Sequence, residues 1–454
     1  MLKKSIQKNE NIIISKSDLC EIFLSGCKDC SQKNIGLEYE KLGIKKTNFE
    51  AASYFDISSF LLNFQKKTKE NWLNIKDNDA LVGLVSKNGT ITLEPGAQTE
   101  LSLKPMQNIF DIETYLKTYN IETAKIADKQ GVIWLGYGIQ PISTYRNINI
   151  IPKKRYECMT RYLPNVAPKP FIMMRETAGI QVSVDYKSEE DAMKKFALSL
   201  KLSPIVSAMF ANSPIRNGRL TKYKSNRALS WLEMDSTRCG LVSAKALRKG
   251  DFTFQDYVEI LLDVPMIFIE RENSLGYKNT INLSGLTFRE FLKNGHEGYF
   301  ATKEDWLLHL SLYFPDVRFK NYIEIRNHDN QRQELICSIP AFWKGLLYND
   351  DAISAVEELL KDFSYFDFEY LRRMTPKNGL DVKIKHHNLK DYAQELVKIS
   401  SQSLKLYGLG EEVFLIPIEE LLKKNLTPAD IIIQNWESIW AHKIEKFIEY
   451  SKLS

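Results

Sequence analysis

The sequence lacks the features that would assign it to a membrane or to a nucleic acid. No run of about 18 apolar residues occurs in the chain of 454 residues, so we expect no transmembrane helix. Residues 1–11 are rich in lysine and asparagine and contain no apolar core followed by small residues, which is not the pattern of a secretory signal. The formal net charge of +5 is spread over mixtures of lysine and glutamate, and basic runs such as residues 153–155 are short. A nucleic-acid groove needs a clustered basic patch, so we expect no nucleic-acid partner.

Cysteine is scarce, with six residues in the whole chain. Such a low content is typical of a reducing compartment, and from it we predict a cytoplasmic location. Residues 27–30 form a C-x-x-C pair. A zinc site needs a second ligand pair, and a thioredoxin-like motif needs a preceding parallel strand. Neither is recognisable in the sequence, so a chance pair is the better interpretation.

The two common glycine-rich phosphate-binding patterns are also missing. Neither G-x-x-x-x-G-K-[ST] nor G-x-G-x-x-G occurs in the chain. If the protein binds a nucleotide, a sheet surface and metal ions must hold its phosphates.

Composition and length fit a folded protein with a large core. Hydrophobic residues make up 44% of the chain and charged residues 26%, which are ordinary values for a globular protein. A chain of this length can form two or three domains, but mixed α/β enzymes also reach it as one unit. No linker clearly divides the sequence, and residues 351–363, 389–406 and 418–454 have helical periodicity.

Two glutamates lie two residues apart in the segment 35–44, between apolar neighbours. This spacing suits a β-strand, in which Glu38 and Glu40 point to one face and Leu37 and Tyr39 to the other. Like charges on one strand face repel each other unless a cation lies between them. An isolated pair of this kind is more often a solvated edge strand. A metal site is favoured only if other carboxylates are placed in the same way.

Polar side chains of this kind recur after the next predicted hairpin. Residues 81–93 form a hairpin around an Asn-Gly pair, which suits a type I′ turn. The second strand continues into Glu94, Gln98 and Glu100, with a Pro-Gly bend that can re-aim Glu94. Four glutamates therefore lie on two strand segments.

Two later strands add further groups of the same chemistry. Residues 179–186 alternate apolar and polar side chains, with Gln181 on the polar face. In residues 321–327, Glu324 and Arg326 face away from the core together. We expect both strands to contribute to the same polar surface.

A helix is predicted over residues 225–238. Arg227, Trp231, Asp235 and Arg238 recur at intervals of four, four and three residues, so they would share one helix face. This stripe suits either a surface salt-bridge ladder or, after the preceding Gly/Pro loop, the recognition of a carboxylate. The spacing alone leaves both interpretations open.

The chemistry of these groups indicates hard metal ions. All candidate ligands are oxygen donors without a Cys/His cluster, which favours magnesium or manganese over zinc. More carboxylates than one divalent ion can neutralise indicate two or three ions. Several such ions beside arginine and lysine are what transfer of a phosphoryl group from ATP requires.

Taken together, these segments resemble the plant-type glutamate–cysteine ligases, and the match runs in order through nearly the whole chain. It is carried by residues 36–41, 93–102, 211–214, 227–240, 262–266, 322–326 and 340–348. The resemblance implies an α+β fold similar to glutamine synthetase, in which a curved, mainly antiparallel sheet forms a metal-lined funnel with helices packed outside. It also implies a catalytic region over residues 1–345, with an N-terminal helix, and a helical region over residues 346–454 packed on the same domain.

The resemblance further implies an ATP-dependent ligation, the first step of glutathione synthesis. ATP phosphorylates the γ-carboxylate of glutamate, and the amine of cysteine then displaces phosphate to give γ-glutamylcysteine. The implied partners are glutamate, cysteine and ATP, with two or three Mg²⁺ ions (or Mn²⁺), no nucleic acid and no membrane. The chain is expected to act as a monomer or a homodimer.

The same resemblance implies metal-binding and catalytic roles for particular residues. The implied metal ligands are Glu38, Glu40, Glu94, Glu100, Gln181 and Glu324. Arg326 and Lys41 are implied to contact the phosphates of ATP and to stabilise charge on the transferring group. Together with Glu324, they form the implied catalytic set.

Other matched positions imply a substrate pocket. Arg227 and Trp231 resemble the pocket for glutamate, with the guanidinium of Arg227 forking onto a carboxylate. Asp235 and Arg238 resemble partners that orient this pair. Arg175 departs from the plant pattern, in which an arginine lies closer to the ligand glutamine, although it remains a candidate contact to the substrate.

Two alternatives to the glutamate–cysteine ligase remain. One is a carboxylate–amine ligase of the same fold that uses a different acid or amine. The other is a non-catalytic regulatory relative, which usually loses metal ligands, whereas each ligand position is intact in this sequence.

The cysteines generate a prediction about redox control. In plant relatives, a cysteine at the place of Cys337 is joined to a second cysteine, and that second place falls near Glu113 in this chain. A disulfide needs two cysteines with Cα atoms within about 7 Å, so we expect no thiol switch. Activity after mild oxidant and after reductant should agree within assay error, in both the natural protein and the Cys337→Ser variant. A reversible loss on oxidation that Cys337→Ser abolishes would contradict this expectation.

Overall fold

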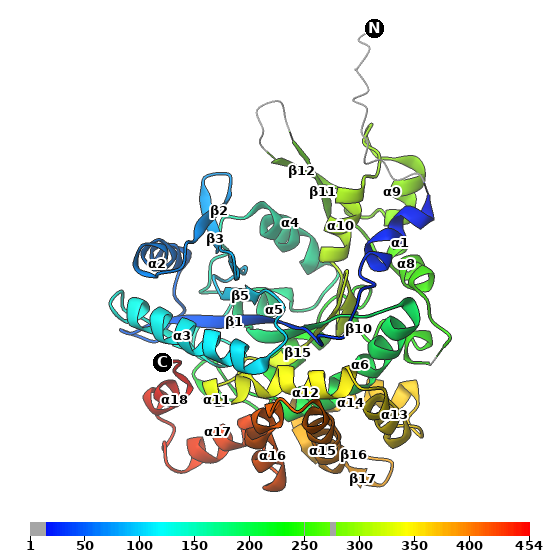
Figure 1. Ribbon diagram of the computed structural model, residues 1–454. Coiled ribbons are helices and arrows are strands. Elements are labelled where there is room, and N and C mark those ends of the chain that lie inside the picture. Colours follow the sequence, from blue (N-terminus) through cyan, green and yellow to red (C-terminus); the bar gives the residue numbers. More distant parts are fainter. Residues whose placement is uncertain (1–14, 249, 273–277) are drawn as a thin grey trace.

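The protein folds around one large antiparallel sheet, as the computed structural model in Figure 1 shows for residues 15–248, 250–272 and 278–454. The strand order is β14-β15-β7-β1-β5-β4-β3-β2, with β6 paired to β1 beside β7 and β5. The nine strands are β1 (Ile35–Lys45), β2 (Leu73–Asp77), β3 (Ala80–Val85), β4 (Gly89–Leu93), β5 (Thr99–Leu103), β6 (Val132–Leu135), β7 (Gly179–Val184), β14 (Val317–Phe319) and β15 (Ile323–Asp329). Every pairing in this sheet is antiparallel, and the sheet is open at β14 and β2. The predicted mixture of helices and a mainly antiparallel sheet is therefore confirmed.

Helices surround this sheet. They are α1 (Lys16–Leu24), α2 (Tyr54–Lys67), α3 (Ile109–Asp128), α4 (Lys154–Tyr162), α5 (Pro170–Glu176), α6 (Glu189–Met209), α7 (Asn226–Leu232), α8 (Phe254–Leu262), α9 (Phe288–Asn294), α10 (Lys303–Ser311), α11 (Gln333–Ile336), α12 (Ser338–Leu347), α13 (Asp350–Leu359), α14 (Tyr365–Asn378), α15 (Leu389–Tyr407), α16 (Ile416–Lys423), α17 (Pro428–Glu437) and α18 (Ile444–Ser451). Figure 1 shows α12, α15 and α16 below the central strand β1, and α4 and α10 above it. In the ranges that the structure describes, no helix is long and apolar enough to cross a membrane.

Among the described residues, four pairs of short strands lie outside the main sheet. They are β8 (Ile215–Arg216) with β9 (Arg219–Leu220), β10 (Cys239–Gly240) with β13 (Phe314–Pro315), β11 (Phe268–Glu272) with β12 (Lys278–Asn282), and β16 (Lys383–Ile384) with β17 (His387–Asn388). The β10–β13 pair is parallel, and β13 comes just before β14 in the chain. This pair therefore helps to fix the edge of the main sheet.

Strand β1 lies at the centre because it pairs with β5, β6 and β7. Its side chains alternate as a strand requires. Leu37 and Tyr39 are fully buried in the main hydrophobic core, whereas Glu38 and Glu40 line a cavity on the opposite face. One strand thus divides an apolar side covered by helices from a polar side open to ligands.

A buried ion pair ties the C-terminal helices to the rest of the molecule. Lys344 of α12 and Glu411 lie 2.6 Å apart, and neither side chain is exposed. Lys344 also donates a hydrogen bond to the carbonyl of Gln107, and Glu411 accepts one from the backbone N–H of Ile109. The proposed boundary after residue 345 falls inside α12, which continues to Leu347. The division into two regions stays a prediction.

Cys337 is a buried thiol at the junction of α11 and α12. Burial raises the pKa of Cys337 to about 12, and the next contribution comes from the Glu113 carboxylate on α3. Glu113 therefore lies near this thiol, as the resemblance to the plant enzymes implied. All six cysteines are free thiols.

Candidate functional site

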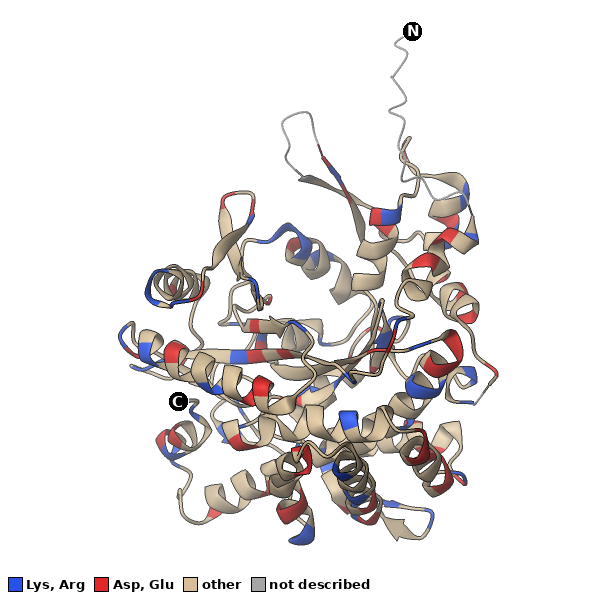
Figure 2. Ribbon diagram, viewed as in Figure 1, with Lys and Arg blue, Asp and Glu red and all other residues tan. Residues whose placement is uncertain are grey.

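A cavity of about 360 Å³ lies on the polar face of the sheet. One wall carries the carboxylates of Glu38, Glu40, Glu94 and Glu100, together with Gln181. Another part of the lining carries the cations of Lys153, Arg155, Arg318, Lys320 and Arg326. Below, these two sets are called the carboxylate wall and the cationic wall. Elsewhere acidic and basic residues are interspersed along the ribbon (Figure 2).

The pairing of β1 with its neighbours builds the carboxylate wall. Glu40 lies directly opposite Glu100 of β5, and Glu38 lies opposite Gln181 of β7. Like charges that face each other across two strands destabilise a sheet. This arrangement is unfavourable without a cation and is therefore typical of a binding site.

The electrostatics of the carboxylate wall reflect this crowding. Burial raises the pKa of Glu40 to about 7, with a further upward contribution from Glu94 and a downward one from Arg227. Burial and then the charge of Glu324 raise the pKa of Glu38. The pKa of Glu100 is raised well above its usual range by burial and then by the neighbouring glutamates. Burial and the neighbouring negative charges therefore both disfavour the ionised form of these carboxyls.

Glu94 occupies the position that the Pro-Gly bend re-aims. It follows β4, and a left-handed residue, Ala97 with φ of 65°, closes the turn before β5. The hydroxyl of Tyr156 donates to Glu94 Oε1 at 3.2 Å, which holds the carboxylate at the cavity. The predicted bend therefore brings Glu94 beside the other glutamates.

Glu324 belongs to the cationic wall by its contacts. Its oxygens lie 2.6 Å from Arg318 Nε, Lys320 Nζ and Arg326 Nη1. Burial alone would raise the pKa of Glu324, but these three cations hold it well below its usual range. Lys320 also lies 4.0 Å from Glu38, and so links the two walls.

Gln181 lies between the two walls. Its Oε1 accepts a hydrogen bond of 2.6 Å from Arg326, and its Nε2 donates to Glu40 and Glu100 at 3.2 and 3.3 Å. In this arrangement the amide oxygen points to a cation and not to the carboxylate wall.

The donor set fits hard divalent ions in part. In the part of the chain that the structure describes, no three acidic, histidine or cysteine side chains are already gathered in a metal-binding cluster. The four glutamates of the carboxylate wall nevertheless face one cavity and repel one another, which a divalent cation would relieve. Gln181 and Glu324, the other two implied ligands, instead bind cationic side chains.

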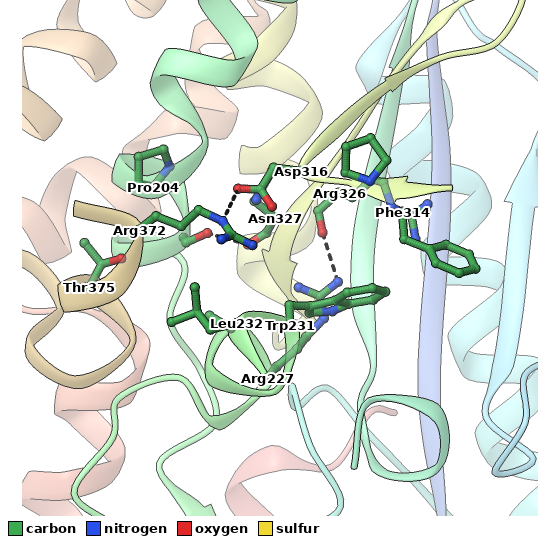
Figure 3. A pocket seen from close by; sticks show the side chains of 13 residues that line it. Pro204, Arg227, Trp231, Leu232, Phe314, Asp316, Arg326, Asn327, Arg372 and Thr375 are labelled. Atoms are coloured by element: carbon green, nitrogen blue, oxygen red, sulfur yellow. Dashed lines mark hydrogen bonds and ion pairs between the residues drawn. The ribbon is translucent and has the colours of Figure 1, made fainter. Parts of the chain in front are cut away.

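Arg227 and Trp231 lie together on α7 and line the cavity. Arg227 is buried and donates to the carbonyl of Arg326 at 2.9 Å, while its Nε has no hydrogen-bond partner in the structure. The indole N–H of Trp231 also lacks a partner. Figure 3 shows these two side chains beside Arg326, in a small neighbouring pocket that also contains Arg372 and Asp316. The free donors suit an anionic group.

The predicted helix over residues 225–238 is too long, because α7 ends at Leu232. Asp235 instead forms a turn, in which it accepts hydrogen bonds from the backbone and hydroxyl of Thr237 at 2.9 and 2.7 Å. Asp235 and Arg238 form a buried ion pair of 2.7 Å, and Arg238 also binds the carbonyls of Leu312 and Pro265. This pair joins separate segments and does not line the cavity, so its predicted role in orienting Arg227 and Trp231 is not supported.

Lys41 also lies away from the cavity. Its fully buried side chain points to the same face as Tyr39, where it donates to Thr123 at 2.7 Å and lies 4.0 Å from the Tyr119 ring centre. Burial lowers the pKa of Lys41 well below its usual range. We therefore withdraw Lys41 from the proposed phosphate contacts.

Arg175 is directed away from the cavity as well. Its guanidinium donates to the carbonyls of Tyr145 and Ile148 at 3.1 and 3.2 Å and packs over the ring of Phe171. It closes a loop, and the structure does not bring it to Arg227.

Four cationic residues of the site were not predicted from the sequence. Arg318 faces Glu324 across β14 and β15, and two residues on, Lys320 points to the same side. Their period-2 spacing before residue 321 was the available signal. In the sequence, Lys153 and Arg155 are recognisable only as part of a short basic run. Both flank the start of α4 and line the cavity.

Comparison with known proteins agrees with the family resemblance of the sequence motifs. A model of "Glutamate-cysteine ligase family 2 (GCS2)" matches residues 34–449. The chain is 32% identical to the chloroplastic glutamate–cysteine ligase of Solanum lycopersicum over 440 residues, which cover 96% of this chain and 82% of that protein. It is also 32% identical over 439 residues to the chloroplastic enzyme of Arabidopsis thaliana, with the same coverage of 96% and 82%.

A solved structure supports the fold. The crystal structure of glutamate–cysteine ligase from Francisella tularensis, in complex with AMP, superimposes with a TM-score of 0.52 and 16% sequence identity. The match covers 91% of this chain and 86% of that chain.

The comparisons contradict the predicted cytoplasmic location. The similar curated enzymes from Solanum lycopersicum, Nicotiana tabacum, Arabidopsis thaliana and Oryza sativa are all named chloroplastic. Scarce cysteine indicates a redox environment and not a particular compartment. The cytoplasmic prediction was therefore wrong.

The position of Lys41 gives a testable prediction. Replacing this buried cation by methionine should leave kcat/KM within about threefold and should stabilise the fold at pH 7, because burial disfavours the charged form of Lys41. Because the folded pKa lies below 10.5, the natural protein gains stability as pH rises toward 10.5, so the difference should shrink in that direction. Chemical denaturation at several pH values measures this. A large loss of kcat in Lys41→Met with an unchanged fold would return Lys41 to the site.

Proposed function

Because this chain belongs to glutamate–cysteine ligase family 2, we propose that it joins the γ-carboxylate of glutamate to the amine of cysteine at the expense of ATP. The observation that supports this proposal is that the carboxylate wall and the cationic wall line one cavity side by side. The first wall suits divalent ions, and the second suits the phosphates that those ions accompany. The residues proposed to bind metal ions and ATP phosphates are assigned from this pairing of charges.

On the carboxylate wall, Glu38, Glu40, Glu94 and Glu100 would hold Mg²⁺, as two or three ions, with Mn²⁺ as a substitute. When bound, these ions neutralise phosphate charge and hold the reacting oxygens in line. Gln181 and Glu324 join them as ligands only if their side chains exchange a cationic partner for a metal ion. Their present contacts favour roles in fixing Arg326 instead.

On the cationic wall, five side chains meet the phosphates of ATP. Arg326 is held by Glu324 and Gln181, both at 2.6 Å, so its guanidinium is oriented before a substrate arrives. Such preorganised cations stabilise charge that develops on a transferring phosphoryl group. Arg318 and Lys320 are fixed by the same carboxylate. Lys153 and Arg155 approach from α4.

Arg227 and Trp231 are proposed to bind a carboxylate of glutamate. Both have an N–H without a partner in the structure, and a carboxylate can accept from the two together. The hydrogen bond from Arg227 to the carbonyl of Arg326 joins this pocket directly to the cationic wall. The γ-carboxylate can therefore lie where the phosphoryl group is delivered.

The reaction consists of two substitutions. An oxygen of the glutamate γ-carboxylate attacks the γ-phosphorus of ATP, and ADP leaves with the electrons of the broken P–O bond. The amine of cysteine then attacks the acyl carbon, inorganic phosphate leaves, and the amine loses a proton. The cations of the second wall stabilise the phosphate oxygens in both steps.

The proposal covers the organisation of the chain as well. A catalytic region over residues 1–345 and a helical region over residues 346–454 would act as one unit, joined by the Lys344–Glu411 pair. The unit would act as a monomer or a homodimer.

Phosphate release tests this function directly. The purified full chain should release phosphate only when glutamate, ATP and a divalent metal are all present, and cysteine should be the best amine when candidates are tested singly at equal concentration. Omitting glutamate serves as the control for simple ATP hydrolysis. A much faster turnover with another amine would favour a different carboxylate–amine ligase, and no glutamate-dependent release at all would favour a non-catalytic relative.

A further inference from the structure

The cavity has a third, apolar surface that neither charged wall explains. Met159 of α4 and Met173 and Met174 of α5 line it beside the charged groups. All three side chains are more than 90% buried, at 4%, 8% and 1% relative exposure. We call this surface the methionine corner.

The polar groups around the methionine corner are already paired with one another. The hydroxyl of Thr177 donates to the carbonyl of Met173 at 2.7 Å. The side-chain amide of Gln98 donates to the carbonyl of Thr177 at 2.8 Å and to that of Met174 at 3.4 Å. The amide oxygen of Gln98 in turn accepts from Gly96 N–H at 2.8 Å. A polar group that entered this corner would find these hydrogen-bond donors already engaged.

We propose that the methionine corner receives the side chain of the amine substrate and selects a thiol over a hydroxyl. This inference rests on the proposed function and names the part of the site that determines the acceptor. A thiol is a weak hydrogen-bond donor and loses little when it leaves water, whereas a hydroxyl loses strong hydrogen bonds without replacement. Methionine thioethers are polarisable and adapt to the shape of a small sulfur-containing group.

The position of the corner fits the geometry of the reaction. Helix α5, which carries Met173 and Met174, packs against α7, which carries Arg227 and Trp231. An amine whose side chain enters the corner therefore lies beside the proposed glutamate pocket. Its nitrogen can approach the acyl carbon while its own side chain stays away from the charged walls.

Substrate analogues test the proposal with the unaltered protein. 2-Aminobutyrate, which has a methyl group in place of the thiol, should be used far better than serine, because an apolar corner accepts a methyl group. The ratio of kcat/KM between cysteine and serine should reach about 10²-fold, the discrimination that an apolar pocket achieves against a hydroxyl. Serine used as well as 2-aminobutyrate would overturn the proposal without any variant.

Two matched variants locate the selectivity. Met173→Gln introduces an amide that can bind a hydroxyl, and should lower the ratio of kcat/KM for cysteine over serine at least about tenfold. Met173→Leu keeps the corner apolar at similar volume and should hold that ratio within about threefold. Met159→Gln provides an independent second position, in case Met173→Gln does not fold.

Hydroxylamine separates this proposal from the proposed function. It has no amino-acid side chain to enter the corner, so glutamate-dependent product formation with hydroxylamine should remain detectable in both glutamine variants and shows that they fold and activate glutamate. An unchanged cysteine-to-serine ratio in variants that still use hydroxylamine would overturn the role of the corner alone. No glutamate-dependent phosphate release with hydroxylamine or any amino acid in the natural protein would overturn both proposals.

Discussion

The repulsion between carboxylates on neighbouring strands is the constraint on which the site depends. The register of β1 with β5 places Glu40 opposite Glu100, and Glu38 and Glu94 face the same cavity. A sheet that served only as a scaffold would not keep four half-buried carboxylates at one cavity. The fold compensates by extending the same surface through β15 and β14, which place Arg318, Lys320 and Arg326 next to the carboxylates.

The cationic wall is organised by one buried glutamate. Glu324 binds three cations, each at 2.6 Å, and so fixes groups that would otherwise repel one another. The wall is therefore preorganised, and binding phosphates to it costs little reorganisation. Its neighbour Gln181 contacts both walls, which couples the arrangement of the cations to that of the carboxylates.

Much of this site was predictable from the alternation of side chains along strands. That rule correctly places Glu38, Glu40 and Glu100 at one cavity. The rule also assigns Lys41, two residues after Tyr39 on the same strand, to the opposite face. The phosphate contact that the family resemblance implied for Lys41 was wrong because it disregarded this alternation. The position of Glu94 depended on a left-handed turn that the Pro-Gly pair made recognisable.

Other features could not be predicted because they depend on tertiary contacts. The spacing of Asp235 and Arg238 suits a helix, but the side chain of Asp235 binds the following backbone and stabilises a turn instead. Strand β14 has only three residues, so the period-2 spacing of Arg318 and Lys320 is too short a signal to identify them as site residues by itself. The methionine corner brings together α4 and α5, whose mutual position no local pattern specifies.

The central claim, that the carboxylate wall is a strained site completed by a divalent cation, is tested most directly by thermal unfolding of Glu100→Gln. This change removes one charge of the Glu40–Glu100 pair and keeps the shape of the side chain. Without metal, we predict that the variant unfolds about 1 °C above the natural protein, the shift expected from about 1 kcal/mol at about 2.1 cal/mol/K of unfolding entropy per residue. Added Mg²⁺ should raise the Tm of the natural protein more than that of the variant. A variant that is less stable without metal, together with equal Mg²⁺-dependent shifts in both proteins, would contradict the account.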